Sequence, residues 1–115
     1  NLLLSLLNTV ERALADRNGI DVEKSLEMLF KEALNYVENP VRVTVDPRDV
    51  EIAREMLNRK GLVNVEIKTS DGILGGVIVE SADGKRIDNS YKTRLENAKK
   101  IVARMLAEVL RSTGS

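Results

Sequence analysis

The run from Ile73 to Val79 constrains the fold of this chain more than any other segment. Its sequence, ILGGVIV, has no polar side chain and contains two adjacent glycines. A strand that is apolar on both faces belongs inside a sheet and requires cover on each side. The run therefore predicts an internal strand that is covered on both of its faces.

The remaining apolar residues fall into helical and strand patterns around this run. Helical spacing predicts a helix over residues 2–17, a second that begins after Asp21 and stops before residue 40, a third between residues 47 and 61, and a last one capped by Asn89 or Ser90. Strict alternation predicts strands at 41–45 and 63–67. An Asp83-Gly84 hairpin brings residues 85–88 back against the internal strand.

The predicted order is helix, helix, strand, helix, strand, strand, strand, helix. It favours an α/β (α+β) fold in which about four helices cover a mixed four-stranded sheet. Short links around the third helix predict that the strands on either side of it are parallel. We expect a single globular domain over residues 18–115. Residues 1–17 begin without Met or a helix cap, which we interpret as the end of a truncated stalk helix that leads into the domain.

Gly75 and Gly76 allow two interpretations. Glycine inside a strand marks a bulge or a place where another part of the protein comes close. The favoured interpretation is a packing notch under a helix. The alternative function is a free-standing α/β module that binds a ligand or RNA through the Gly75-Gly76 notch.

Composition argues against several functional classes. The chain has 18 basic and 18 acidic residues, so it lacks the basic excess that is typical of a nucleic-acid partner. It contains no His and no Cys, the commonest general base and the thiolate ligand of metal sites. No phosphate-binding motif occurs. We expect no catalytic residue, no metal site and no cofactor.

Two carboxylates and one apolar cluster remain as candidate functional residues. Asp83 and Asp88 are interpreted as turn residues rather than as a catalytic pair. The apolar segment at the start of the chain is much shorter than the ~20 residues of a membrane helix, so we expect no direct insertion into a membrane. Its leucines crowd more apolar surface into two turns than one core can cover, which predicts a partner-binding surface. These residues are Leu2, Leu3, Leu4, Leu6 and Leu7.

The segment LGGVIVESADGKRIDNSYKTRLE, residues 74–96, resembles the C-terminal part of the E subunit of the archaeal and vacuolar-type rotary ATPases. Ser90 stands where the family usually has Thr, which keeps the capping hydroxyl. The long, charged, N-terminal coiled-coil half of that family is absent from this chain. The positions that match the family pattern are Gly75, Gly76, Val77, Ile78, Val79, Glu80, Asp83, Gly84, Asp88, Asn89, Arg94 and Leu95.

The resemblance implies a non-catalytic component of the peripheral stalk, or stator, of a proton-translocating A/V-type ATPase or ATP synthase. Such a component pairs with a second stalk protein, a long helix of the G/H type. Its globular domain docks on the B subunit of the A3B3 catalytic head, with the A subunit as a further candidate, and resists rotor torque. The implied location is peripheral, on the cytoplasmic face of the membrane. The leucine cluster would then contact the helix of the second stalk protein.

Overall fold

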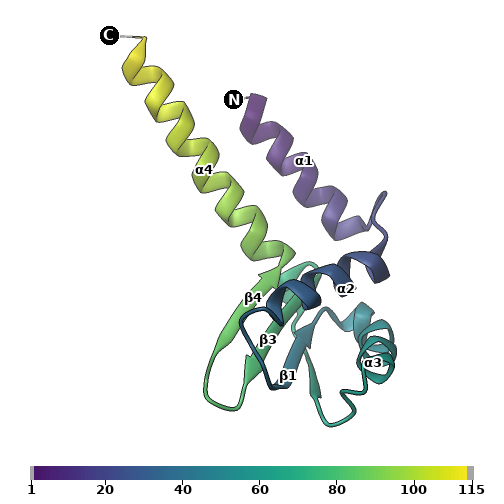
Figure 1. The fold of residues 1–115 in the computed structure, drawn as a ribbon. Coiled ribbons are helices and arrows are strands. Elements are labelled where there is room, and N and C mark those ends of the chain that lie inside the picture. Colours follow the sequence, from purple (N-terminus) through teal and green to yellow (C-terminus); the bar gives the residue numbers. More distant parts are fainter. Residues whose placement is uncertain (1, 114–115) are drawn as a thin grey trace.

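The structure is a computed structural model that describes residues 2–113. Within that range it contains four α-helices and one four-stranded sheet (Figure 1). Two short 3-10 turns, Pro47–Asp49 and Asp71–Ile73, complete the chain. The order and type of the elements confirm the predicted fold. They are α1 (Leu2–Asp16), α2 (Val22–Ala33), β1 (Pro40–Val45), α3 (Val50–Arg59), β2 (Glu66–Thr69), β3 (Gly76–Ser81), β4 (Arg86–Ser90) and α4 (Tyr91–Ser112).

The sheet is mixed, with the strand order β2-β1-β3-β4. β1 and β2 run parallel, as the short links around α3 predicted, and Val43 is paired with Ile67. β3 lies antiparallel to both β1 and β4, and Val79 is in register with Val43 on one side and Ile87 on the other. β3 is therefore an internal strand, as expected from its apolar sequence.

The apolar core lies on one face of this sheet. Helices α2 and α3 supply its upper layer, and Phe30 and Met56 are almost fully buried against Val43, Val45, Val77 and Val79. We call the sheet with α2 and α3 the sheet body. Its central residues, which Tyr91 from the start of α4 joins, are Leu26, Leu29, Phe30, Ala33, Val37, Val43, Val45, Ala53, Met56, Leu57, Val77 and Val79.

β3 is buried on both faces over residues 76–79, as expected, although its two faces differ. Ile78 points away from Val77 and Val79 because successive side chains of a strand alternate, and it is buried between neighbours at Thr44 and Asp88. On that same face Arg42 forms ion pairs with the carboxylates of Glu66 (3.2 Å) and Glu80 (3.6 Å). The second face is thus a charged surface with one buried apolar residue.

Three element boundaries also differ from the prediction. β3 begins at Gly76, because a 3-10 turn ends at Ile73 and Leu74 has a φ of 67°. β2 begins at Glu66 rather than Val63, whose side chain is 70% exposed. α2 ends at Ala33, and residues 34–36 form a turn before the link to β1.

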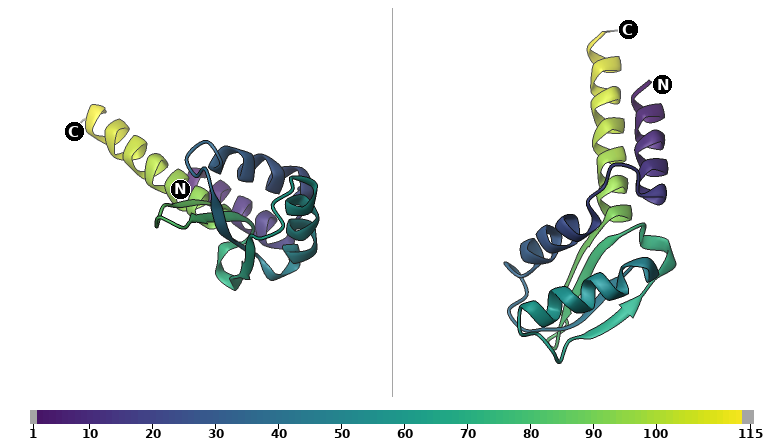
Figure 2. Two further views of the ribbon diagram at one scale, coloured as in Figure 1. Left: turned by 60° about the horizontal axis from the view of Figure 1, so that its bottom comes forward. Right: turned by 90° about the vertical axis from the view of Figure 1, so that its right-hand side faces the viewer.

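Helices α1 and α4 extend away from the sheet body as an antiparallel pair (Figures 1 and 2). We call them the helix pair. The molecule measures 59 × 31 × 20 Å along its principal axes, and the projecting helices account for the long dimension. No residue described in α1 is buried, and the buried residues of α4 are Tyr91 and Leu95, in its first two turns. The helix pair therefore lies almost wholly outside the core.

Candidate partner-binding surface

The helix pair carries the largest group of exposed apolar side chains in the described part of the molecule. Leu2 is 77% exposed, Leu6 53% and Met105 59%. Among the predicted partner-binding leucines only Leu7 is half-buried. The large exposed apolar residues of the pair are Leu2, Leu3, Leu4, Leu6 and Val10 on α1, and Ile101, Met105, Val109 and Leu110 on α4.

The apolar residues of both helices repeat with the spacing of a coiled coil, in which intervals of four and three residues alternate. This repeat is typical of helices that pack side by side along their length. One ion pair also crosses from α1 to α4, with the Lys99 ammonium 3.2 Å from a Glu11 carboxylate oxygen. The repeat comprises Leu3, Leu7, Val10 and Leu14 on α1, and Leu95, Ala98, Val102, Met105 and Val109 on α4.

A groove of about 320 Å³ opens where the helix pair meets α2. Its walls are apolar, from Val10 and Leu14 of α1, Met28 of α2 and Ala98 of α4. Met28 is 62% exposed, although it belongs to a helix whose other face is in the core. Val10 lines the groove and is also one of the exposed apolar residues of the helix pair. The groove and these exposed residues therefore form one apolar surface.

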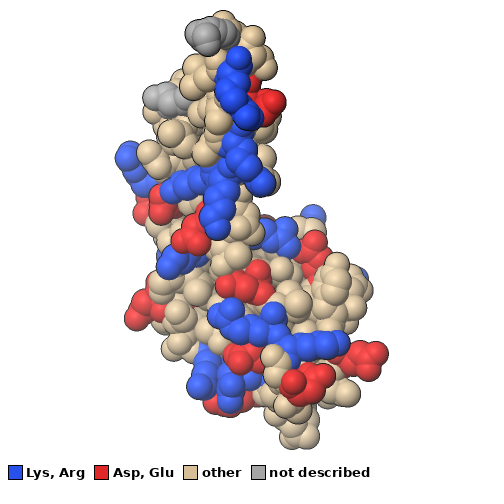
Figure 3. Space-filling view, turned by 90° about the vertical axis from the view of Figure 1, so that its left-hand side faces the viewer, with Lys and Arg blue, Asp and Glu red and all other residues tan. Residues whose placement is uncertain are grey.

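Charged side chains lie next to this surface. Figure 3 shows Lys and Arg side chains following the length of the projecting helix, and α4 contains six basic and two acidic residues. At the groove, the Arg94 guanidinium contacts a Glu32 carboxylate oxygen at 2.6 Å, which links α4 to α2 across the exposed surface. Exposed pairs of this kind contribute about 0–1 kcal/mol, so apolar contacts dominate the energetics of the surface.

The adjacent glycines Gly75 and Gly76 lie where the helix pair joins the sheet body. A Cβ atom on Gly75 would lie 2.5 Å from the ring of Tyr91 and 3.3 Å from a guanidinium nitrogen of Arg17. A Cβ atom on Gly76 would lie 2.5 Å from the backbone oxygen of Asn89. Both glycines also have positive φ angles, of 144° and 76°. The space beside them is occupied by the protein's own side chains and backbone.

The link from β4 into α4 is held by local hydrogen bonds. The Ser90 hydroxyl accepts a hydrogen bond from the Thr93 N–H at 3.3 Å, so Ser90 rather than Asn89 is the helix cap. Asn89 instead donates its buried amide N–H to the Leu29 carbonyl at 2.9 Å. Burial alone would raise the pKa of Asp88, but hydrogen bonds from Ser90 and Thr93 outweigh it, and the net pKa is lowered.

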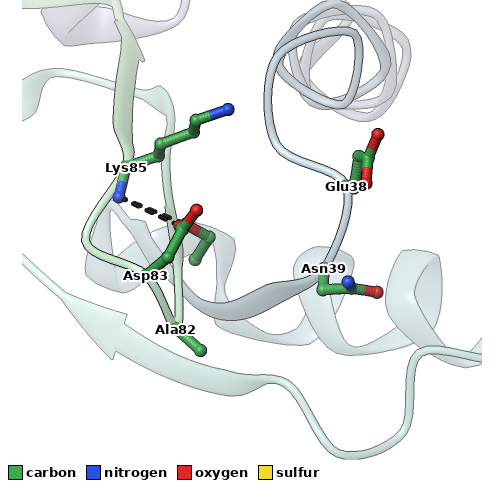
Figure 4. Close-up of a pocket in the computed structure, with 6 residues that line it drawn as sticks. Glu38, Asn39, Ala82, Asp83 and Lys85 are labelled. Carbon is green, nitrogen blue, oxygen red and sulfur yellow. Dashed lines mark hydrogen bonds between the residues drawn. The ribbon is translucent and has the colours of Figure 1, made fainter.

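Asp83 and Gly84 lie at the opposite end of β3, in the hairpin turn. This turn and the α2–β1 link enclose a polar hollow of about 210 Å³ that also includes Glu38 and Lys85 (Figure 4). The Ser81 hydroxyl donates to Asp83 and accepts from the Lys85 N–H at 3.2 Å. Hydrogen bonding from Ser81 lowers the pKa of Asp83. These bonds close the hairpin, and Asp83 and Asp88 do not form a carboxylate pair.

A cluster of charged residues that the sequence did not reveal lies at the base of α1. Arg17 donates two hydrogen bonds to the Asp49 carboxylate, at 3.1 and 3.0 Å, and lies 3.7 Å from Asp46. Arg48 donates to Asp46 at 2.9 Å. That hydrogen bond is the main reason that the pKa of Asp46 is lowered, although burial opposes it. Only the capping role of Asp46 could be predicted locally, because Arg17 and Asp49 are far apart in the sequence.

Two negative findings concern the described residues. Nowhere in residues 2–113 do three or more His, Cys, Asp or Glu side chains gather in an arrangement that could hold a metal ion. Of the helices in that range, none combines the length and apolar character needed to cross a membrane.

Curated relatives of the chain are named as E subunits of A-type ATP synthases or of a V-type ATPase. The E subunit of the A-type ATP synthase of Staphylothermus marinus is 50% identical over 105 residues, which are 91% of this chain and 54% of the relative. The corresponding protein of Pyrococcus abyssi is 30% identical over 115 residues, 95% of this chain and 58% of the relative. The E subunit of the V-type proton ATPase of Halothermothrix orenii is 34% identical over 109 residues, 88% and 54% of the two chains. No protein-family model matches the chain.

These similarities relate the chain to components of A-type ATP synthases and V-type ATPases. Over the matched region it is a homologue of their E subunits. The chain spans about half the length of the curated relatives it matches.

Proposed function

We propose that the chain acts in a rotary A/V-type ATPase or ATP synthase as part of the E subunit, in a peripheral stalk that resists rotor torque. In this role it is non-catalytic. The helix pair binds the long helix of the second stalk protein, and the sheet body docks on the B subunit of the catalytic head, with the A subunit as a further candidate. The complex would place it peripherally, on the cytoplasmic face of the membrane.

The exposed apolar surface of the helix pair is the observation that carries this proposal. Burying one leucine side chain contributes about 1.5–3 kcal/mol. A helix laid along the groove and the adjoining helix pair would cover several exposed apolar side chains, among them Leu6, Val10, Ile101 and Met105. Contiguous exposed apolar surfaces of this kind mark protein–protein contacts in soluble proteins.

The alternative, a ligand- or RNA-binding module that uses the glycine notch, has less support. The Tyr91 ring and the Asn89 backbone approach the two glycines closely. A ligand at Gly75 or Gly76 would have to displace part of the protein's own packing, whereas the groove beside the helix pair is already open.

The test is a pair of matched double substitutions on the helix pair. Leu6→Glu with Met105→Glu puts two charges on the apolar surface, and Asn8→Glu with Ala107→Glu puts two charges at exposed positions away from the apolar repeat. We expect the first variant to bind the second stalk protein at least about tenfold more weakly, equivalent to ~1.4 kcal/mol, by calorimetry. The second should bind as the unmodified protein does.

Two results would count against the proposal. Equal affinity in both variants would mean that the partner does not use this surface. Specific binding of RNA at physiological salt that is lost on substituting Gly75 would favour the module.

A further inference from the structure

The end of α1 has an unusual residue at a critical position. The Asn18 N–H donates to the Ala13 carbonyl at 3.1 Å and the Arg17 N–H to the Leu14 carbonyl at 3.4 Å. These two bonds form a Schellman motif, whose left-handed position is usually occupied by glycine. Here Arg17 occupies it, with a φ of 62°. Since an L side chain is disfavoured in this conformation, a compensating interaction of the side chain is expected.

The Arg17 side chain makes that interaction with two buried carboxylates. Its guanidinium binds Asp49 through two parallel hydrogen bonds, the strongest geometry for this pair. The exposed fractions of the Asp46 and Asp49 side chains are only 6% and 3%. The Arg17 Nε is also buried, without a hydrogen-bond partner in the described part of the chain. Glycine could adopt the same backbone conformation but could not reach these aspartates.

A second arginine ties the same two segments together. The Arg48 side chain donates two hydrogen bonds to Asp46, at 2.9 and 3.2 Å, and another to the Ala15 carbonyl, in the last turn of α1, at 2.8 Å. The contacts therefore run in both directions. Arg17, at the end of α1, binds the link between β1 and α3, and Arg48 of that link binds α1. Arg17 lies close to Gly75, and the absence of a side chain there leaves room for the guanidinium beside Tyr91.

Apolar packing gives α1 little hold on the sheet body, because no described residue of this helix is fully buried and Leu14, in its last turns, is the α1 residue that packs against the core. We infer that Arg17 is a positioning residue, whose ion pairs with Asp46 and Asp49 set the angle at which α1 leaves the sheet body. We call these three residues the polar joint. If the proposed stalk role also holds, part of the force on α1 reaches the sheet body through this joint.

The absence of cysteine from the chain allows the angle to be measured with pairs of spin labels. One pair, at Asn8→Cys and Lys68→Cys, spans from α1 to β2, and both sites are exposed. A second pair, at Lys100→Cys and Lys68→Cys, spans from α4 to β2. Double electron–electron resonance then gives a distance distribution for each helix relative to the sheet.

We expect narrow distributions for both pairs in the otherwise unmodified protein. Arg17→Gly should at least double the width of the α1 distribution while the α4 distribution stays narrow, because α4 continues directly from β4. Glycine is used rather than alanine because the left-handed backbone at residue 17 suits glycine but strains alanine. The test therefore stays valid even if Arg17→Ala fails to fold. Arg59→Ala removes an exposed Arg–Glu pair between α3 and α2 and should change neither distribution.

An unchanged α1 distribution in Arg17→Gly would overturn the inference, since packing against α4 and the contacts of Leu14 and Ala15 would then be enough to set the angle. Broadening of both distributions to the same extent would also overturn it, because the residue would then support the body as a whole. Neither result depends on binding of a stalk partner, so the joint and the proposed function are tested separately.

Discussion

The sheet body and the helix pair use similar apolar residues to opposite effect. α2 contributes Leu26, Leu29, Phe30 and Ala33 to a closed core, whereas the more leucine-rich α1 has no buried position among its described residues. The difference arises from placement, because α2 lies across the sheet and α1 projects beyond it (Figure 2). The apolar residues of the sequence therefore indicated an apolar helix face in both regions. Whether that face is buried within the protein or left exposed depends on how the elements are arranged.

The largest expected effect is a difference between the two regions in the free energy of unfolding that is lost when an apolar side chain is truncated. Phe30 is fully buried in the core, and Phe30→Ala should lower the free energy of unfolding by about 3–5 kcal/mol, from lost burial and the cavity left behind. Met105 is 59% exposed, and Met105→Ala should change it by no more than about 0.5 kcal/mol. Urea denaturation followed by circular dichroism measures both. Similar losses would mean that the helix pair and the body share one core.

The next effect concerns the boundary between the regions. Gly76→Val should cost roughly 3 kcal/mol, because it combines overpacking against the Asn89 backbone with a φ of 76° that disfavours a β-branched side chain. Gly72→Ala is the matched control, since no atom lies within 4 Å of the added Cβ. It should stay within about 0.5 kcal/mol of the unmodified protein. A valine tolerated without loss would mean that β3 and β4 can separate locally at this point.

Local signals in the sequence predicted the body better than its junction with the helix pair. The start of α2 directly after Asp21 and the Asp83-Gly84 hairpin depend on neighbouring residues, and both occur as expected. The predicted start of β3 was too early, because Leu74 adopts a left-handed conformation. A leucine in the sequence gives no indication of that conformation. The Arg17–Asp49 pair joins segments that are distant in sequence, so no periodicity or spacing could reveal it. The leucines of α1 were recognised as excess apolar surface, but their position beside α4 required the fold.

A smaller effect compares the two ends of α4, one in the body and one in the helix pair. Ser90 caps the first turn, and Ser90→Ala should cost about 1 kcal/mol because the Thr93 N–H loses its acceptor. Ser112, at the far end, donates to the Glu108 carbonyl on an exposed turn, and Ser112→Ala should have an effect below about 0.5 kcal/mol. Thermal unfolding of both variants gives the comparison. Equal effects would indicate that the cap is not needed once β4 positions the helix.

The smallest effect is expected from acid, and it acts where the two regions meet. The hydrogen bond from Arg48 lowers the pKa of Asp46 in the folded protein below its ordinary value of about 3.9. A lowered pKa means that the ionised carboxylate stabilises the fold above that ordinary value, and that this contribution is lost as the pH falls below about 4, through the folded-state pKa. Asp46→Asn should therefore be less stable than the unmodified protein at pH 7, and the difference should shrink between about pH 4 and pH 2.

The pKa of Asp83 is lowered as well, but its carboxylate is exposed, so solvent screening should make the pH dependence removed by Asp83→Asn smaller. Urea denaturation across this pH range measures both differences. If Asp46→Asn keeps the same deficit at pH 2 as at pH 7, the lost stability comes from packing of the side chain rather than from its charge beside Arg17 and Arg48.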